Sequence, residues 1–581
     1  MIIFFILLAL LLLPYYIILR KRKTKTTLNY TRKMFMNLDG LWDFRFIKGG
    51  SINDFQYDTT VYEELASVPS CFDATIKYRF QRGLAVYRRY VNAGGMQKLV
   101  IGAIGLRARV FWDGTELGTC PVAFCQEEFR FDAGAPGTHE LVIAVDNIID
   151  NGNDSLWREY YDFYAYGGIY RSITIEEIKE VEITYCKIVT SDLETRTMDI
   201  EIDLAGNYAG KKLTLSVDGK EIATPEAAEK VTLSAALPGA ELWDTDNPVL
   251  HTLNVKIGSV EKSVNFGIRE IKCSDGKILL NGKAFKLFGV NRHDCHPQFG
   301  YAVPEAIVLD DVLAIKAQGF NCIRGSHYPQ SQIFLDICDR VGMLVWNESL
   351  GWQNTIAALN SPGFQQLFLR QTDALVKNAV NHPCIIMWGF LNETYSEHIE
   401  AYPFMKVLAD RVRSWDTSRP LTYASNKTDN DLCMDLSDIM SFNTYPAWYA
   451  IPGSDPNQQE FDPWAVKKAF EIIKGFASQE RFNKRPVLIS EIGAEALPGD
   501  HSGLRWSEDY QADLIDCVLD LIEKDDVLQG VFLWMYCDSK TYSNPGGQSR
   551  ARGYNNKGLV DEYRRPKLSW KVAAKRLKKN N

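Results

Sequence analysis

The stretch IIMWGFLNE, residues 385–393, is an apolar run that ends in an amide and a carboxylate. Seven similar apolar runs lie between residues 286 and 534, and stretches with a helical period separate them. Runs that are apolar on both faces are typical of parallel strands covered by crossover helices. The eight runs are residues 286–290, 321–324, 344–346, 385–390, 421–424, 439–442, 487–490 and 530–534. Together they predict a (β/α)8 TIM barrel.

Polar or aromatic clusters follow almost every predicted strand. The carboxyl ends of barrel strands converge on one mouth, so we expect these clusters to surround a single pocket. Glu393 follows one strand and Glu491 follows another. Hydrolysis of a glycosidic bond with net retention needs one proton-donating carboxyl and one attacking carboxylate, separated by ~5 Å. The two glutamates are therefore candidate catalytic groups, although either one taken alone could be a solvated strand-end carboxylate.

The N-terminal half has a different sequence pattern: short strand-like runs, in which apolar and polar residues alternate, are separated by residues typical of turns. Residues 36–178 predict an antiparallel β-sandwich, with strand-like runs such as 140–145. Residues 179–270 predict a second, smaller sandwich of immunoglobulin size, with runs such as 253–257. Residues 271–581 then form the predicted barrel. The chain is therefore expected to be a multidomain protein.

Composition excludes several classes of protein. The 581 residues are 46% hydrophobic and 24% charged, which is ordinary for a folded soluble protein. The net charge of −8 provides no basic field for a nucleic acid, so none is expected as a partner. The twelve cysteines lack metal-ligand spacing, and most are expected to be reduced, with a bridge between Cys120 and Cys125 left open. No metal site is indicated.

Residues 1–19 are apolar or aromatic apart from Pro14, and a basic segment, residues 20–35, follows them. Nineteen such residues are long enough to span a bilayer. A secretory signal normally has its positive charges before the apolar segment, whereas here they follow it. An uncleaved N-terminal membrane anchor is therefore expected. The basic flank favours a cytoplasmic position for the rest of the chain, and export after cleavage of the leader is the alternative.

Several motifs resemble those of glycoside hydrolase family 2, and the resemblance extends over nearly the whole chain after the leader. WGFLNE, ending at Glu393, resembles the acid/base motif of that family, and ISEIGA, around Glu491, resembles its nucleophile motif. The other matching segments are residues 37–44, 87–89, 242–248 and 266–269. The resemblance implies an N-terminal jelly roll, an immunoglobulin-like β-sandwich and a catalytic barrel, and it implies no cofactor.

The resemblance also assigns roles to residues. It implies that Glu393 is the acid/base, that Glu491 is the nucleophile and that Asn392 hydrogen-bonds the sugar 2-hydroxyl. Asn555 and Lys557, in the stretch Asn555-Asn556-Lys557, resemble the Asn-x-Lys motif with which β-glucuronidases of this family hold the substrate carboxylate. An ammonium and an amide can form charge-assisted bonds with that carboxylate. As a bare pattern, Asn-x-Lys is also compatible with a solvated turn.

Five further positions match the family less specifically. Asp162 lies in a sandwich loop that the family directs to the barrel mouth, and Tyr445 is expected near the nucleophile. His293 and His327 follow the first two predicted strands, and both are also compatible with structural roles. Trp534 is a candidate wall of the sugar site or a core residue. All five are predicted to bind substrate.

These observations predict a retaining exo-acting β-glucuronidase that cleaves terminal β-D-glucuronides by double displacement. Residues 352–361 carry no long loop insertion, so the chain resembles the no-loop, gut-bacterial type and an open mouth is expected. Galacturonide is an open alternative, because Asn-x-Lys does not distinguish the epimers. A neutral-sugar β-galactosidase or β-mannosidase of the same family also stays open, as does a non-catalytic, membrane-tethered carbohydrate-binding protein. Carbohydrate is the expected partner, and a homo-oligomer is the expected assembly.

Overall fold

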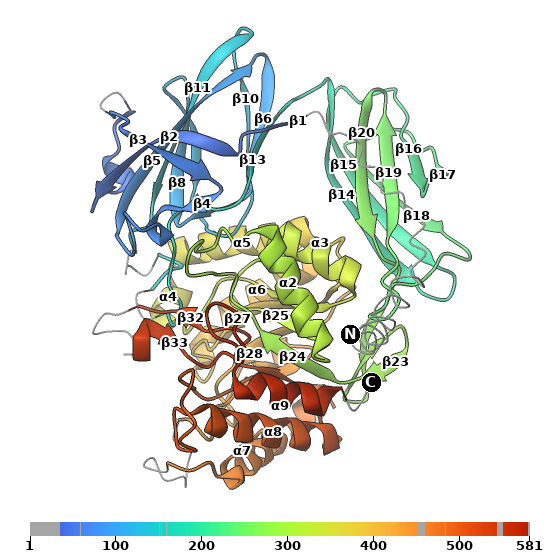
Figure 1. Cartoon of the computed structure of the whole chain (residues 1–581). Helices are drawn as coiled ribbons and strands as arrows, with labels where there is room; N and C mark the ends of the chain where they lie inside the picture. Colours follow the sequence, from blue (N-terminus) through green and yellow to red (C-terminus); the bar gives the residue numbers. More distant parts are fainter. Residues whose placement is uncertain are drawn as a thin grey trace, which may run out of the picture. The chain divides into compact units, whose positions relative to one another are not determined.

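Eight parallel strands close into a barrel in the computed structural model of the chain (Figure 1). Each of the eight predicted apolar runs overlaps one strand, so the predicted TIM barrel is confirmed. Strand bounds differ from the prediction by a few residues, mainly because the strands continue past the apolar runs into polar residues such as Asn291, Glu348 and Asn392. The strands are β24 Leu287–Asn291, β25 Cys322–Gly325, β26 Leu344–Glu348, β27 Ile385–Asn392, β28 Leu421–Ser425, β29 Met440–Asn443, β30 Val487–Ile492 and β31 Leu528–Leu533.

The structure describes residues 35–57, 60–149, 152, 154–158, 161–449, 459–482, 484–542 and 550–578. Residues 36–581 form one compact unit. The predicted membrane anchor, residues 1–19, lies outside the described residues, as does all but the last residue of the basic segment 20–35. Among the described residues, no helix is both long enough and apolar enough to cross a bilayer.

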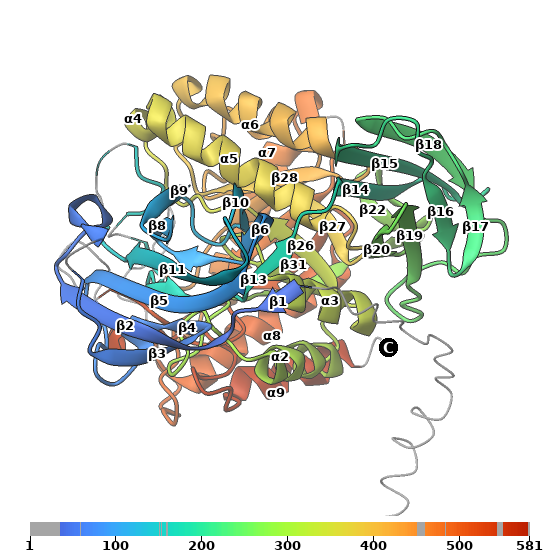
Figure 2. The ribbon, with the colours of Figure 1, turned by 90° about the horizontal axis from the view of Figure 1, so that it is seen from above.

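Helices cover the outside of the barrel (Figure 2). Helix α3 shows how the sequence sets their ends: the Ser331 hydroxyl caps its first turn by accepting from Phe334 N, and Gly342 ends it with φ 73°. Its apolar face is buried against the strands. The helices are α2 Glu305–Ala317, α3 Gln332–Val341, α4 Ile356–Leu359, α5 Pro362–Ala379, α6 Tyr402–Trp415, α7 Pro463–Ala477, α8 Glu508–Lys524 and α9 Leu568–Leu577.

The first β-sandwich packs a six-stranded sheet, β3-β2-β5-β11-β8-β9, with a four-stranded sheet, β1-β13-β6-β10. Its apolar core includes Trp42, Tyr87 and Ile143. A three-stranded sheet, β4-β12-β7, adjoins them. The strands are β1 Phe35–Asn37, β2 Gly40–Lys48, β3 Glu64–Val68, β4 Ser70–Cys71, β5 Gly83–Ala93, β6 Met96–Ile101, β7 Ile104–Gly105, β8 Arg107–Trp112, β9 Thr115–Cys120, β10 Glu127–Asp132, β11 Gly137–Asp146, β12 Gly168–Ile169 and β13 Ile173–Glu177.

A second β-sandwich has sheets β14-β15-β18 and β17-β16-β19-β20, and the sheet β21-β22-β23 precedes the barrel. Alternation of buried and exposed residues along β15 and β19 places one face of each sheet in the core. The strands are β14 Val181–Asp192, β15 Thr197–Gly206, β16 Thr214–Val217, β17 Lys220–Ala223, β18 Lys230–Ala236, β19 His251–Ile257, β20 Val260–Phe266, β21 Ile271–Ser274, β22 Lys277–Leu280 and β23 Lys283–Phe285.

A loop of the first sandwich reaches the barrel mouth, as predicted for the segment that contains Asp162. The backbone N–H of Tyr164 donates to the carbonyl of Lys540, which lies in the short strand β32 Ser539–Lys540, at 2.8 Å. The Tyr542 hydroxyl accepts from the N–H of Ala165 at 3.0 Å. These bonds join the sandwich loop to the segment after β31, on the same side of the barrel as the strand ends.

All twelve cysteines lie in the described part of the chain, and all are free. Ten of them are buried. The prediction of mostly reduced cysteines is therefore confirmed, and the structure contains no bridge between Cys120 and Cys125.

A buried ion pair holds the strand that carries Asn392. Asp416 accepts from the Arg419 guanidinium at 2.6 Å and from the Trp388 indole of β27 at 2.8 Å. Replacing Asp416 with alanine is expected to lower the free energy of unfolding by about 3–5 kcal/mol, because it leaves a buried guanidinium unpaired. Asp410 pairs with Lys406 on the surface, so Asp410→Ala is the control and is expected to cost at most about 0.5 kcal/mol. Denaturant unfolding of both variants measures the difference, and equal losses would contradict it.

Candidate active site

A cavity of about 380 Å³ lies at the carboxyl ends of the barrel strands. Residues from six barrel strands or the loops after them line it, together with the loop of the first sandwich and the segment after β31. The lining residues are Asp162, Phe163, His327, Trp352, Gln353, Glu393, Asn426, Thr428, Asn443, Thr444, Tyr445, Tyr449, Glu491, Trp534, Arg550 and Lys557. Seven of the ten predicted site residues are among them, because a parallel barrel directs all its strand ends to one mouth.

Glu491, near the end of β30, is 3% exposed. Its Oε1 accepts from the Arg324 guanidinium at 2.8 Å, and its Oε2 accepts from the Tyr445 hydroxyl at 2.7 Å. Burial raises the pKa of the Glu491 carboxyl to about 8, with a contribution from the nearby Glu393, and Arg324 and Tyr445 oppose that rise. Each carboxylate oxygen therefore has a donor that holds it in place.

Glu393 directly follows β27 and is 8% exposed. Its backbone φ of 49° is in the left-handed region, which is uncommon for a residue with a side chain and is frequent at functional sites. Asn443 Nδ2 donates to Glu393 Oε1 at 3.0 Å, and Gln353 Nε2 donates to Oε2 at 3.1 Å. Two neutral amides thus hold this carboxyl, whereas a guanidinium holds Glu491.

Arg324, at 0% exposure, joins several strand ends beneath the cavity. Its guanidinium donates to both carboxylate oxygens of Glu348, at 2.9 and 3.0 Å, and to Asn392 Oδ1 at 2.8 Å, besides Glu491. Burial raises the pKa of Glu348 to about 7, against the lowering effect of Arg324. His327 Nδ1 lies 2.8 Å from Glu348, and burial together with Arg324 holds the pKa of that imidazole well below its usual value. The histidine is therefore neutral, and its Nδ1 lies within hydrogen-bonding distance of both Glu348 Oε1 and the Arg324 guanidinium.

Two cations and two carboxylates alternate at one end of the cavity. Lys557 Nζ lies 3.1 Å from Glu495 Oε1, and Arg550 also contacts Glu495. Arg550 donates to both oxygens of Asp162, at 3.0 and 2.5 Å. Asn555, in the short strand β33 Tyr554–Asn555, donates to Asp162 at 2.7 Å and accepts from Lys557 at 3.4 Å. The predicted Asn-x-Lys segment thus reaches the cavity through its lysine, with the asparagine behind it.

Aromatic rings form another wall. The Trp534 ring stacks on His327 with centroids 5.1 Å apart and meets His293 edge-on at 5.5 Å. Phe163 of the sandwich loop lies 5.0 Å from His293. Nε2 of His293 and Nδ2 of Asn392 are buried and make no hydrogen bond with the described residues. Both atoms are therefore candidates to bind a substrate, although neither residue lines the cavity.

Four residues whose side chains hydrogen-bond the side chains of Glu393, Glu491 or Asp162 were not predicted from the sequence. Arg324 was visible as a charged residue in an apolar run, and Asn443 was visible in a strand-end cluster. Gln353 and Arg550 lie in irregular segments, and no sequence pattern or motif marked either of them as a site residue. They reach the site only through the fold.

Two other features of the described residues resemble sites. A larger cavity, of about 500 Å³, lies between the first sandwich and helices α2 and α3, and no predicted site residue lines it. Asp336, Asp339 and His382 have ligand atoms within 4.8 Å of one another. His382 precedes β27, so this group lies at the opposite end of the strand from Glu393. Its Nδ1 already pairs with Asp339 at 2.6 Å.

The site can supply two carboxyls with different environments, a proton and two fixed cations. Burial, together with the charge of the nearby Glu393, raises the pKa of the Glu491 carboxyl, so two adjacent negative charges are disfavoured here. The Arg324 guanidinium stabilises the charged form of Glu491, whereas the two side-chain contacts of Glu393 are neutral amides. Such a pair can protonate a leaving group and attack the atom that it leaves.

Comparisons with known proteins identify relatives. The sequence model of the glycosyl hydrolases family 2 TIM barrel domain matches residues 271–578, more than half of the chain. A β-glucuronidase of Mus musculus is 28% identical over 442 residues, which cover 71% of this chain and 65% of that protein, so the chain spans slightly less than two thirds of its length. A β-glucuronidase of Streptococcus agalactiae serotype V is 26% identical over 603 residues, which cover 94% of this chain and 97% of that protein. The chain is also similar to the crystal structure of a family 2 β-galacturonidase from Eisenbergiella tayi bound to galacturonate, with a TM-score of 0.84 and 29% sequence identity. The similarity covers 94% of this chain and 97% of that chain.

Proposed function

This chain belongs to glycoside hydrolase family 2, and on that premise we propose that it is a retaining, exo-acting β-glucuronidase that hydrolyses terminal β-D-glucuronides. One observation carries the choice of a uronic acid: the Lys557 ammonium and the Arg550 guanidinium line the same cavity as both glutamates. A substrate carboxylate can form hydrogen-bonded ion pairs with these cations, whereas a neutral hexose has no charge to pair with them. The names of the mouse and streptococcal relatives support the same substrate class.

The mechanism needs no group beyond the side chains of the site. Glu491 attacks the anomeric carbon, while Glu393 gives its proton to the glycosidic oxygen and the aglycone leaves. Glu393, now a carboxylate, takes a proton from water, and that water releases the sugar from Glu491 with net retention. The Tyr445 hydroxyl and the Arg324 guanidinium hold Glu491 in both steps, because each bonds one of its oxygens.

A β-galacturonidase is the second candidate. The similarity to the Eisenbergiella tayi enzyme covers 94% of the chain, and Lys557 and Arg550 bind the substrate carboxylate in either epimer. Glucuronate and galacturonate differ only in the configuration at the 4-hydroxyl, so binding of the carboxylate alone does not distinguish them. The choice therefore depends on the groups that face that hydroxyl.

Hydrolysis of matched aryl β-D-glucuronide, β-D-galacturonide, β-D-glucoside and β-D-galactoside tests the proposal. We expect turnover of the glucuronide to exceed that of both neutral glycosides. Higher turnover of the galacturonide would select the second candidate. A preference for a neutral glycoside would reject both uronidase proposals, and no turnover in the whole panel would favour a non-catalytic protein.

Arg324 is expected to set the acid limb of the pH profile. It lowers the pKa of Glu491, so a less well-placed cation in Arg324→Lys lets that pKa rise, and the nucleophilic carboxylate forms at higher pH. The acid limb of kcat/KM should move to higher pH, with a loss of about 10²-fold at neutral pH. Arg292→Lys is the control, because Arg292 is equally buried but pairs with Asp294 and Asp311. An equal shift in both variants would contradict the assignment.

Residues 1–19 support a separate proposal on location. We propose that they anchor the protein in a membrane as a single N-terminal helix, with the catalytic part on the cytoplasmic side; export after cleavage of the leader is the alternative. Their apolar composition and the basic flank carry this proposal. Reporter fusions at each end and the intact mass of the purified protein distinguish the two. The expected homo-oligomer stays a prediction, for analytical ultracentrifugation to test.

A further inference from the structure

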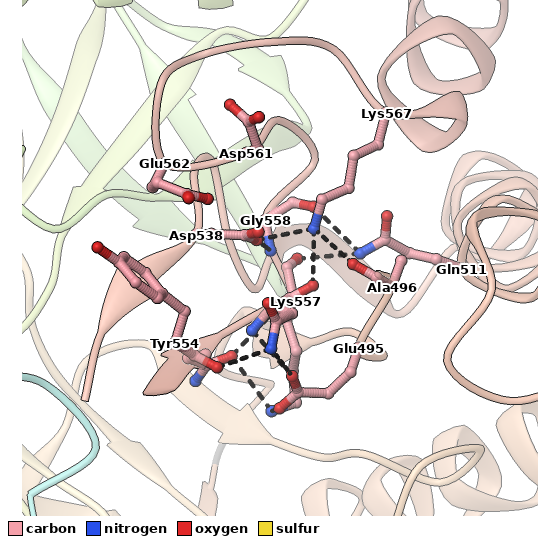
Figure 3. Close-up of polar contacts among 12 residues, drawn as sticks. Glu495, Ala496, Gln511, Asp538, Tyr554, Lys557, Gly558, Asp561, Glu562 and Lys567 are labelled. Carbon is pink, nitrogen blue, oxygen red and sulfur yellow. Dashed lines mark hydrogen bonds and ion pairs between the residues drawn. The ribbon is translucent and has the colours of Figure 1, made fainter. Parts of the chain in front are cut away.

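Glu495 is a buried carboxylate that the mechanism does not use. It follows Glu491 by four residues and is 0% exposed. Its Oε1 contacts both Lys557 Nζ and Arg550 Nη1, and its Oε2 accepts from the backbone N–H of Asn556 at 2.8 Å and from its Nδ2 at 3.1 Å. Figure 3 shows Glu495 beside Lys557 in this network. One carboxylate thus contacts both cations and the backbone between Asn555 and Lys557.

Electrostatics explains why this carboxylate is charged in a buried place. Burial alone would raise its pKa, but Lys557, Arg550 and the Asn556 N–H together hold the pKa of Glu495 below its usual value. A buried charge is tolerated only when it is paired and hydrogen-bonded. Because two like charges repel, the shared anion between Lys557 and Arg550 also permits the two cations to lie close together.

The position of Lys557 is defined from several sides, and Glu495 is its only anionic contact among the described residues. The Lys557 ammonium lies 5.8 Å from the Tyr445 ring centroid and 5.6 Å from that of Tyr449. Tyr445 in turn donates to the nucleophile Glu491. Glu495 does not line the cavity, whereas Lys557 and Arg550 do. It therefore stands behind the cations, on the side away from the substrate.

We propose that Glu495 is a positioning residue for uronate recognition, which holds the Lys557 ammonium and the Arg550 guanidinium as a preformed pair for the substrate carboxylate. The inference rests on the proposed uronidase function and deepens it. A lysine side chain has a flexible stem, so its ammonium binds a carboxylate well only if another group already restrains it. Glu495 supplies that restraint without contact to the substrate.

The proposal predicts a selective effect. Without the charge of Glu495, the two cations repel each other and Lys557 leaves its place, so binding of a uronate weakens while the groups around Glu393 and Glu491 stay in position. For an aryl β-uronide, Glu495→Gln is therefore expected to raise KM at least tenfold with kcat within threefold. The Kd of free uronic acid should rise by the same factor. Glu495→Asp keeps the charge and should recover part of the loss.

Asp538 provides the matched control. It is also a buried carboxylate of the same network, but it pairs with Lys567 at 2.7 Å and with Arg552 at 3.0 Å, and it accepts from the Gly558 N–H. It does not contact Lys557 among the interactions of the described residues. Asp538→Asn is therefore expected to lower thermal stability and to leave the KM for the uronide within about twofold.

The experiment measures kcat and KM for an aryl β-glucuronide and an aryl β-galacturonide, and the Kd of both free uronic acids by calorimetry. It uses the wild-type chain and the Glu495→Gln, Glu495→Asp, Asp538→Asn and Lys557→Ala variants, with melting curves for all. If Lys557→Ala has no effect on uronides, the proposed function fails. If Lys557→Ala weakens uronate binding but Glu495→Gln behaves as Asp538→Asn does, or binds uronate more tightly, only the positioning role is overturned.

Discussion

Replacing Glu491 with alanine is expected to lower kcat for an aryl β-uronide by at least about 10⁴-fold, because the variant has no group to form the glycosyl–enzyme intermediate. The carboxylate is buried, and Arg324 and Tyr445 already point donors at it, so no other residue can take its place. Steady-state hydrolysis of the best uronide in the panel measures the loss. Glu508→Ala, at a buried glutamate of α8 that bonds Gly499 and Leu568 outside the cavity, is the control and should keep its kcat.

Azide separates the roles of the two glutamates. In Glu491→Ala, azide enters the vacated position and attacks from the face opposite the aglycone, so the expected product is the α-glycosyl azide. In Glu393→Ala, an activated aryl glycoside still forms the intermediate on Glu491, and azide then attacks from the other face to give the β-glycosyl azide. The anomeric configuration of each product identifies the residue that was removed. The same anomer from both variants, or turnover in Glu491→Ala near that of the wild type, would refute the assignment.

Lys557→Ala is expected to reduce kcat/KM for the uronide by about 10³-fold, or about 4 kcal/mol, because the buried substrate carboxylate loses one of its two cations. Lys557 is 2% exposed, so solvent water has little access to the position that its ammonium leaves. Any turnover of the matched neutral glycoside should change by less than threefold, because that substrate has no charge to pair. The ratio of the two values of kcat/KM is the measurement.

Lys567→Met is the control for the lysine. Lys567 is equally buried but bonds Asp538 and the carbonyls of Ala496 and Asn556, and it does not line the cavity. It should lose stability and keep the ratio of uronide to neutral glycoside. Unchanged uronide turnover in Lys557→Ala would leave the catalytic pair intact and discard the uronate site.

The barrel could be predicted because its signal is local. Each strand is a short apolar run bounded by turns, and the stretches between the strands have a helical period of about 3.6 residues; both patterns involve only neighbouring residues. The runs around β27 and β30 also end in Glu393 and Glu491, and the barrel topology alone implies that these ends meet. The motif resemblance assigned their roles without any knowledge of the fold.

The partners of these residues could not be predicted in the same way. Arg550 reaches Asp162 across 388 residues of sequence, and Arg324 reaches Glu491 across 167. Neither separation has a period or a motif. Asp162 was predicted to bind substrate, yet Arg550 and Asn555 occupy both of its oxygens in the structure. Its direct role in substrate binding stays a prediction.

The sequence by itself determined the fold class, the catalytic pair as candidates and the family, because apolar periodicity and strand-end motifs depend only on adjacent residues. The tertiary structure alone decided which charges meet: it places Lys557 and Arg550 against the common carboxylate of Glu495, and it places Asn392 and His293 behind the cavity wall. The physical reason is that electrostatic interactions depend on distance and burial, and both are set by how loops from separate parts of the chain pack together.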